Sequence, residues 1–252
     1  MRRVDGLFEQ RMTQVGRDRV YYEVGGDGPA VVLMHGLSGS TRWWARNTAV
    51  LAKRFRVYVV DLIGFGRGHG QRFVLENTAG LIAAWLDGIG VDTCHVIGHS
   101  MGGLVAAELA AQRPERVDHL VLVDAAALPL GRTIVGSALR LVPALAFMPV
   151  DFLPVLVTDA LRAGPLTLLR ATRAIHQADI SADLAHIAAR TLIIWGEDDT
   201  LLPASRGAEL HLALPGSEFV VVRGAGHNPM WDQPARFNRL VTRFLESNPE
   251  DA

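Results

Sequence analysis

The sequence predicts an α/β protein in which a mainly parallel, doubly wound sheet is covered by helices on both faces. Two observations lead to this prediction: short β-branched runs alternate with helical stretches, and most of these runs are apolar throughout. A strand buried on both faces has no polar side, whereas a half-exposed strand alternates apolar and polar residues. Strands that alternate with helices pair in parallel within one sheet.

Seven runs are predicted as strands. In chain order they are VYYEV (Val20–Val24), AVVLM (Ala30–Met34), RVYVV (Arg56–Val60), TCHVI (Thr93–Ile97), HLVLV (His119–Val123), TLIIW (Thr191–Trp195) and EFVVV (Glu218–Val222). The turn-forming sequence GGDGP at residues 25–29 separates the first two runs. We therefore expect these two strands to form an antiparallel hairpin at the N-terminal side of the sheet.

Two of the helical stretches have clear apolar faces. The first covers residues 78–87, with Asn77 as the expected N-cap and Gly88 at its end. The second lies near the C-terminus. Its apolar stripe consists of Phe237, Leu240, Val241, Phe244 and Leu245.

A long segment without a clear strand follows the run that ends at Val123. It is rich in Leu, Val, Ala and Pro, and we interpret it as a small helical cap over the strand ends. The predicted organisation is a core of residues 1–125 and 187–252 with a cap insertion at residues 126–186. Because open α/β sheets bind ligands at the carboxyl ends of their strands, we expect the chemistry in the loops beneath this cap.

Composition excludes several classes of protein. The net charge of −1 over 252 residues provides no basic face for nucleic acid. The single cysteine, Cys94, excludes an internal disulfide. The N-terminal sequence lacks an apolar signal segment, and the apolar stretch at residues 141–157 contains three prolines and is short for a bilayer span. We expect a cytoplasmic protein with no membrane or nucleic-acid partner, and its oligomeric state is left open.

The motif GHSMG at residues 98–102 lies between a predicted strand and the helix-like sequence LVAAELAAQ. A G-x-S-x-G motif in this context places a serine on a sharp strand-to-helix turn, with its hydroxyl raised out of the sheet. The N-terminus of the following helix adds a positive field where an oxyanion would develop. Ser100 is therefore the predicted nucleophile.

Further motifs occur in order along the chain. They are HGLSGS (residues 35–40), DLIGFGRG (61–68), GHSMGG (98–103), WGEDD (195–199) and GAGHNPMWDQP (224–234). With these motifs the chain resembles the α/β-hydrolase superfamily over nearly its whole length, in the branch that uses a serine nucleophile. Haloalkane dehalogenases and typical epoxide hydrolases of this superfamily use a nucleophilic aspartate, so Ser100 argues against both activities.

A serine hydroxyl needs a base to become nucleophilic. The resemblance implies His227, in the glycine-rich loop after the last strand, for this role. It also implies structural roles for His35 and His99, which belong to other motifs. His95 and His119 lie inside predicted strands and are expected in the core.

The base in turn needs a carboxylate to orient it. The resemblance implies Asp199, which places the triad in the chain order Ser100, Asp199, His227 that is expected for this fold. Two alternatives stay open. Asp198 is adjacent, and Asp124 ends the strand after which some members of the superfamily keep their acid.

The resemblance also implies an oxyanion hole made by the backbone N–H groups of Met101 and Leu37. No HExxH, CxxC or clustered carboxylates occur, so no metal is expected. No G-x-G-x-x-G follows a strand, so no dinucleotide or other cofactor is expected.

The expected activity is hydrolysis of carboxylic esters of small to medium apolar molecules through an acyl-enzyme. One alternative is a carbon–carbon hydrolase acting on diketone-like ring-cleavage products, which an arginine-bearing pocket would favour. The other is a ligand receptor with low turnover on the same fold. The apolar sequences at residues 139–150 and 152–157 of the cap favour acyl chains of about four to eight carbons, because each buried methylene contributes about 0.8 kcal/mol.

Overall fold

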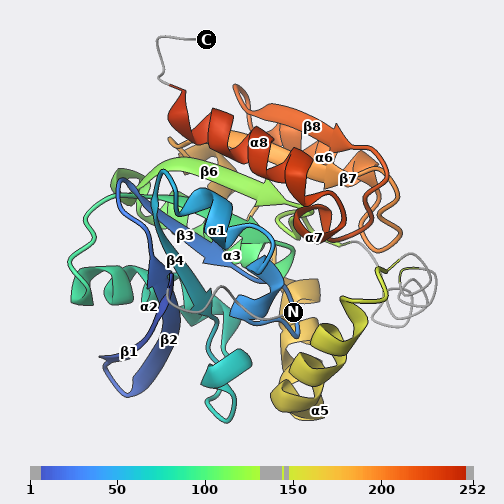
Figure 1. Ribbon diagram of the computed structural model, residues 1–252. Coiled ribbons are helices and arrows are strands. Elements are labelled where there is room, and N and C mark those ends of the chain that lie inside the picture. The colour runs from blue at the N-terminus through green and yellow to red at the C-terminus, as the bar shows by residue number, and fades with distance from the viewer. Residues whose placement is uncertain (1–6, 131–143, 145–147, 248–252) are drawn as a thin grey trace.

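The computed structural model describes residues 7–130, 144 and 148–247, and these residues confirm the predicted α/β architecture (Figure 1). The sheet has eight strands in the order β1-β2-β4-β3-β5-β6-β7-β8. The strands are β1 (Glu9–Val15), β2 (Asp18–Gly25), β3 (Ala30–Met34), β4 (Arg56–Asp61), β5 (Cys94–His99), β6 (Val117–Val123), β7 (Arg190–Gly196) and β8 (Glu218–Val222). From β4 to β8 along this order the strands are parallel.

An antiparallel N-terminal hairpin is confirmed, but its strands differ from the predicted pair. β1 pairs with β2 around a turn at Gly16, and β2 then pairs antiparallel with β4. The predicted partner β3 lies on the far side of β4, so residues 25–29 form a crossover and not a hairpin turn. β1 has no apolar run because it is an edge strand whose residues are mostly exposed. The periodicity used to find the other strands is therefore absent there.

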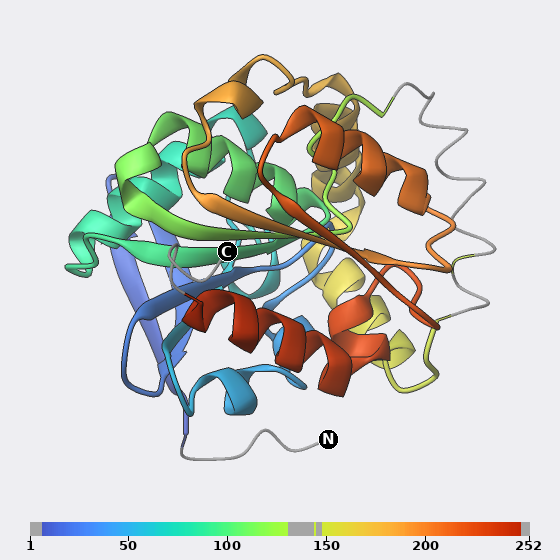
Figure 2. The same ribbon diagram turned by 90° about the horizontal axis from the view of Figure 1, so that it is seen from above.

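Helices cover both faces of the sheet. They are α1 (Thr48–Leu51), α2 (Leu75–Gly88), α3 (Met101–Gln112), α5 (Leu153–Gln177), α6 (Ala204–Ala213), α7 (Pro229–Asp232) and α8 (Pro234–Glu246), with 3-10 turns η1 (Thr41–Trp44), η2 (Gly66–Gly68), η3 (Pro114–Arg116) and η4 (Asp183–His186). Figure 2 shows α8, in red, below the sheet and α3, in green, above it. Each face carries its own cluster of buried apolar side chains.

Both helices singled out from the sequence are present. In α8 four of the five predicted apolar residues are buried, and Leu240 is half-buried. α2 begins at Leu75, three residues before the expected start, so Asn77 lies inside the helix and is not its N-cap. The residue at the cap position is Val74, whose side chain makes no capping hydrogen bond.

α5 is the main described element of the predicted cap. It is kinked at Gly164, which has φ 76°, and the next residue is Pro165. Its first half is held to the core through Asp159, whose carboxylate is fully buried and accepts hydrogen bonds from Ser40 Oγ and Arg42 Nη2, both at 2.7 Å. Residues 131–143 and 145–147, which include much of the apolar sequence assigned to the cap, lie outside the described residues. The division of the chain into a core and a cap insertion at residues 126–186 stays a prediction.

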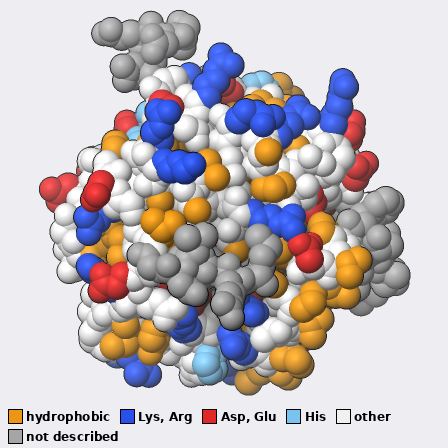
Figure 3. Space-filling view, in the orientation of Figure 1, with side chains coloured by type: hydrophobic (Ala, Val, Ile, Leu, Met, Phe, Trp, Pro, Cys, Tyr) orange, Lys and Arg blue, Asp and Glu red, His pale blue; other side chains and the backbone are white. Residues whose placement is uncertain are grey.

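The outer side of α5 carries exposed apolar side chains, which gather at the lower right of the view in Figure 3. They include Leu153, Val157, Leu161 and Leu166. No helix in residues 7–130 and 148–247 combines the length and the apolar character needed to cross a bilayer.

One half-buried acid in α3 makes stability depend on pH. The carboxyl group of Glu108 faces Glu76 of α2 and Asp183 of η4, and its Oε2 has no hydrogen-bond partner among the described residues. Burial, and then these two acids, raise the pKa of Glu108 to about 7. Because the native state holds a proton that the unfolded chain has already released, stability should fall as pH rises from about 4.5 to 7.

We expect Glu108→Gln to stabilise the protein at pH 8 by about 1 kcal/mol, after allowing for the screening of a partly exposed group. This corresponds to a rise in Tm of about 2–4 °C. At pH 4 the wild type and the variant should unfold at the same temperature. Thermal unfolding at both pH values tests this, with the exposed Glu115→Gln as the control. Equal gains at pH 4 and pH 8 would contradict the titration of Glu108.

Candidate active site

Ser100 occupies a strained turn between β5 and α3. Its backbone has φ 53° and ψ −114°, a region that residues other than glycine rarely adopt. The motif glycines allow this turn because backbone atoms approach each other closely. A Cβ at Gly98 would lie 2.3 Å from the carbonyl oxygen of Gly102, and one at Gly102 would lie 2.5 Å from that of His35. The local sequence therefore produces the predicted elbow geometry.

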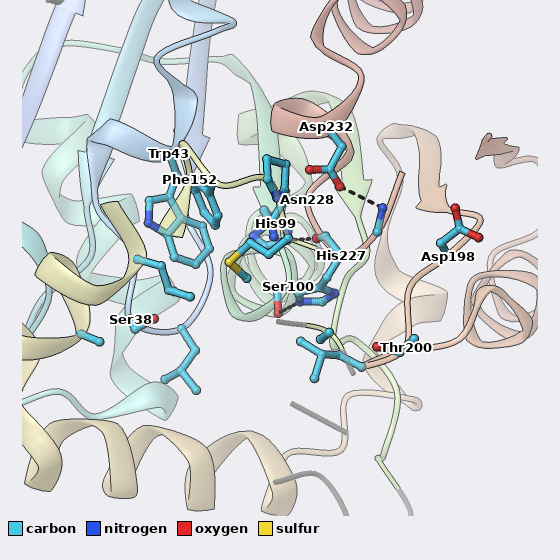
Figure 4. Close-up of a pocket in the computed structure, with 18 of the residues that line it drawn as sticks. Ser38, Trp43, His99, Ser100, Phe152, Asp198, Thr200, His227, Asn228 and Asp232 are labelled. Carbon is cyan, nitrogen blue, oxygen red and sulfur yellow. Dashed lines mark hydrogen bonds between the residues drawn. The ribbon is translucent and has the colours of Figure 1, made fainter. Parts of the chain in front are cut away.

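The structure brings Ser100, His227 and Asp199 together. His227 follows β8, and its Nε2 lies 3.0 Å from Ser100 Oγ (Figure 4). On the other side of the ring, Nδ1 lies 2.7 Å from Asp199 Oδ2. The second oxygen of Asp199 accepts the backbone N–H groups of Leu201 at 2.8 Å and Leu202 at 2.9 Å. A fully buried carboxylate with these three donors holds the imidazole with Nε2 free to accept the serine proton.

The two alternative acids occupy different positions. Asp198 is exposed, and its backbone N–H bonds to the carbonyl of Ala225. Asp124 is fully buried and lies beside Asp199 and His227, with donor and acceptor atoms of the three residues within 4.8 Å of one another. It makes no direct hydrogen bond to His227 among the described contacts. Its Oδ1 accepts the backbone N–H of Gly196 at 2.9 Å.

The two motif histidines bond to backbone. His99 Nε2–H donates to the carbonyl oxygen of His227 at 2.7 Å and so holds the loop that carries His227. His35 Nε2 accepts the N–H of Leu62 at 3.0 Å, and Nδ1–H donates to the carbonyl of Gly36. Burial lowers the pKa of both imidazoles, which keeps them neutral.

His95 and His119 are buried in the sheet as expected, where both rings contact the side chain of Asp118. This group is separate from the residues around Ser100.

The predicted oxyanion-hole residues, Leu37 and Met101, belong to segments that lie next to Ser100. Met101 is the first residue of α3, where a backbone N–H has no acceptor within the helix. Leu37 belongs to the loop after β3, which lies close to the elbow: a Cβ at Gly36 would be 3.1 Å from Ser100 Cβ. Leu37 and Ser38 both line the cavity that contains Ser100.

That cavity has a volume of about 410 Å³, within the range of small-molecule sites. Its apolar lining from the predicted cap segment includes Met148, Phe152, Leu156 and Leu168. Trp43 and Phe152 lie together on one side of Ser100, and Thr200 and Asp198 lie on the other (Figure 4). No Lys or Arg belongs to the lining found in the described residues.

Two residues of this site were not predicted from the sequence. Trp43 and Trp44 are adjacent, and the sequence alone favours the core for both, but only Trp44 is fully enclosed. Trp43 forms part of the cavity wall and packs edge-on against Phe152, with ring centres 5.1 Å apart. Asp232 lines the cavity and accepts the N–H of Gly226 at 2.8 Å. Burial raises the pKa of Asp232 to about 6. The sequence signal that could have identified Asp232 is its position in the motif GAGHNPMWDQP, which also contains His227.

Comparisons with known proteins show the family to which the chain belongs. The sequence profile of the alpha/beta hydrolase family matches residues 31–240. A Pseudomonas syringae pv. syringae protein, provisionally named carbamate hydrolase RutD, is 33% identical over 248 residues, which cover 88% of this chain and 96% of that protein. A 2-hydroxy-6-oxo-6-phenylhexa-2,4-dienoate hydrolase from Burkholderia cepacia is 29% identical and covers 90% of this chain and 91% of its own length. The crystal structure of the enol-lactonase from Burkholderia xenovorans LB400 superposes with a TM-score of 0.79 at 25% identity, covering 94% of this chain and 100% of that one.

Proposed function

Because the chain belongs to the alpha/beta hydrolase family, we propose that it is a serine hydrolase that cleaves carboxylic esters of small to medium apolar molecules. The observation that supports this most is the hydrogen-bonded series from Ser100 Oγ through His227 to Asp199, at an apolar cavity. We propose Ser100 as nucleophile, His227 as base and Asp199 as the acid that orients it.

The proposed reaction has two steps. Ser100 Oγ attacks the ester carbonyl while its proton passes to His227 Nε2, and the oxyanion accepts hydrogen bonds from the N–H groups of Leu37 and Met101. Collapse of this intermediate breaks the ester C–O bond, and the alcohol leaves with the proton from His227. Water then gives a proton to His227 and attacks the acyl-enzyme, which releases the acid and restores Ser100.

The cavity lining supports an uncharged substrate. A dienoate from ring cleavage carries a carboxylate, which an arginine in the pocket would bind. Of the five cap arginines, Arg162, Arg170 and Arg173 are exposed on α5, and Arg132 and Arg140 lie outside the described residues. The charged side chains in the described lining are instead the carboxylates of Asp198 and Asp232, which would repel such an anion.

A substrate panel separates the candidate functions. It should contain p-nitrophenyl butyrate, an aryl carbamate and a ring-cleavage dienoate, because relatives bear the names of a carbamate hydrolase and a dienoate hydrolase. We expect kcat/KM to be highest for the butyrate ester. A higher value for the dienoate would establish carbon–carbon cleavage instead, and tight binding of an ester without turnover would identify a receptor.

Acyl-chain preference should show a maximum. For p-nitrophenyl esters of about two to sixteen carbons, we expect kcat/KM to rise near fourfold per carbon, as about 0.8 kcal/mol per methylene implies, and to fall beyond about eight carbons when the cavity is full. A maximum at acetate or at the longest chain would contradict this prediction.

A matched pair of variants on α5 locates the acyl pocket. Leu156 lines the cavity, whereas the next residue, Val157, is 48% exposed. Leu156→Trp should move the optimum to shorter chains because it reduces the cavity volume. Val157→Trp should leave the optimum unchanged. Equal behaviour of the two variants would place the acyl group elsewhere.

A further inference from the structure

Asp124 is a second carboxyl group at the site, and the backbone holds it rigidly. It follows β6, and its own N–H donates to the carbonyl of Ile194 at 2.9 Å. Its backbone has φ 42°, the left-handed region, and its side chain is fully buried. Oδ1 accepts the N–H of Gly196, whereas Oδ2 has no hydrogen-bond partner among the described residues. A fully buried carboxylate oxygen without a donor is costly, so this oxygen requires an explanation.

The surroundings of Asp124 contain one other buried acid at close range. Asp199 and His227 lie beside it, with donor and acceptor atoms of the three residues within 4.8 Å, and the charge of Asp232 also acts on it. Two carboxyl groups that share a buried position cannot both be ionised without a large repulsion. One of the pair, Asp124 or Asp199, must therefore hold a proton.

Hydrogen-bond donors decide which of the two keeps its charge. Asp199 accepts two backbone N–H groups on Oδ1 and the imidazole on Oδ2. Asp124 accepts one backbone N–H. Each donor stabilises the ionised form of the carboxyl that it contacts, so Asp199 is the anion and the proton belongs on the free Oδ2 of Asp124.

We propose that Asp124 is a neutral carboxylic acid whose Oδ2–H donates a hydrogen bond to the Asp199 carboxylate, which makes Asp124 a positioning residue for the His227 base. This inference rests on the proposed function only in the role of Asp199 as orienting acid. The hydrogen bond holds the carboxylate plane of Asp199 and withdraws part of its negative charge. Burial, followed by the charge of Asp199, raises the pKa of Asp124 well above its usual range, in agreement with the proposal.

The test compares Asp124→Asn with Asp124→Ala. In Asp124→Asn the side-chain oxygen can still accept the Gly196 N–H, and the NH₂ group takes the place of the proposed O–H donor without a change of charge. Asp124→Ala removes the donor. The first measurement is the titration midpoint of the His227 imidazole by NMR in the resting protein, which requires no substrate.

For Asp124→Asn we expect the His227 midpoint to stay at the wild-type pH and kcat to change less than about threefold. For Asp124→Ala the Asp199 carboxylate keeps its full charge, so the midpoint should move to higher pH and kcat should fall about tenfold with KM little changed. If Asp124 were ionised, Asp124→Asn would remove a negative charge beside the imidazole and move the midpoint to lower pH. That shift, or identical behaviour of the two variants, would overturn the proposal.

Infrared spectroscopy provides a second measurement that does not depend on activity or on the alanine variant. At neutral pH Glu108, whose pKa is about 7, contributes a protonated-carboxyl band in both proteins. The wild type should show an additional carbonyl band from the fully buried carboxyl group of Asp124, and the difference spectrum against Asp124→Asn should isolate it. If no ester is hydrolysed but the band and the titration behave as expected, the proposed function fails and the proton assignment stands. If esters are hydrolysed and the band is the same in both proteins, the assignment fails alone.

Discussion

Replacing Ser100 with Ala should lower kcat for an activated ester on the order of a millionfold, as loss of the nucleophile does in other serine hydrolases. The variant should keep its fold, because the strained turn depends on backbone packing at Gly98 and Gly102 and not on the hydroxyl. Initial rates with p-nitrophenyl butyrate, together with a melting curve, measure both quantities.

The matched control is Ser205→Ala, which changes an exposed serine on α6 and should leave the rate unchanged. A serine-directed phosphonate followed by peptide mass spectrometry should label Ser100 alone in the wild type. Label on another serine, with activity that survives Ser100→Ala, would remove Ser100 as the nucleophile.

Asp199→Asn should have the second-largest effect, a loss in kcat of about a thousandfold or more. An asparagine can still accept the N–H groups of Leu201 and Leu202 on one atom, so the loop should persist. Its NH₂ group would then face Nδ1 of His227 and favour the tautomer with a proton on Nε2. In that tautomer the imidazole cannot accept the proton of Ser100.

Asp198→Asn provides the comparison for this result. It makes the same change of charge at the next residue, which is exposed, and should lower kcat less than tenfold. Steady-state rates at one pH are sufficient. The opposite result would be a large loss of activity in Asp124→Asn and little loss in Asp199→Asn. In that case the orienting acid would be Asp124, which follows β6.

Much of the fold could be predicted because its signals are local. A strand buried on both faces must be apolar throughout, so β3 was predicted at its observed limits. β1 was missed because an exposed edge strand has no such requirement. The pairing of β2 with β4 could not be read from either strand, since the order of strands depends on how the chain crosses over the sheet.

The sequence by itself predicted the position of Ser100, because a G-x-S-x-G turn is built from adjacent residues. His227 and Asp199 were implied by the family resemblance, and the local sequence left Asp198 and Asp124 as alternatives to Asp199. Asp124 and Asp199 follow the neighbouring strands β6 and β7. Both are buried near the imidazole, and only the three-dimensional structure shows which oxygen faces Nδ1.

The tertiary structure also decided what surrounds the serine. Trp43 and Trp44 are neighbouring tryptophans, and no local pattern distinguishes them. Only Trp43 forms part of the cavity wall, because η1 is oriented by its contacts with the core and with Phe152. Likewise, with α5 docked through Asp159, Leu156 and Leu168 face the cavity. Other leucines of the same helix, such as Leu161, are exposed. Residue identity sets what a side chain can do, but its direction follows from long-range packing, which no local pattern contains.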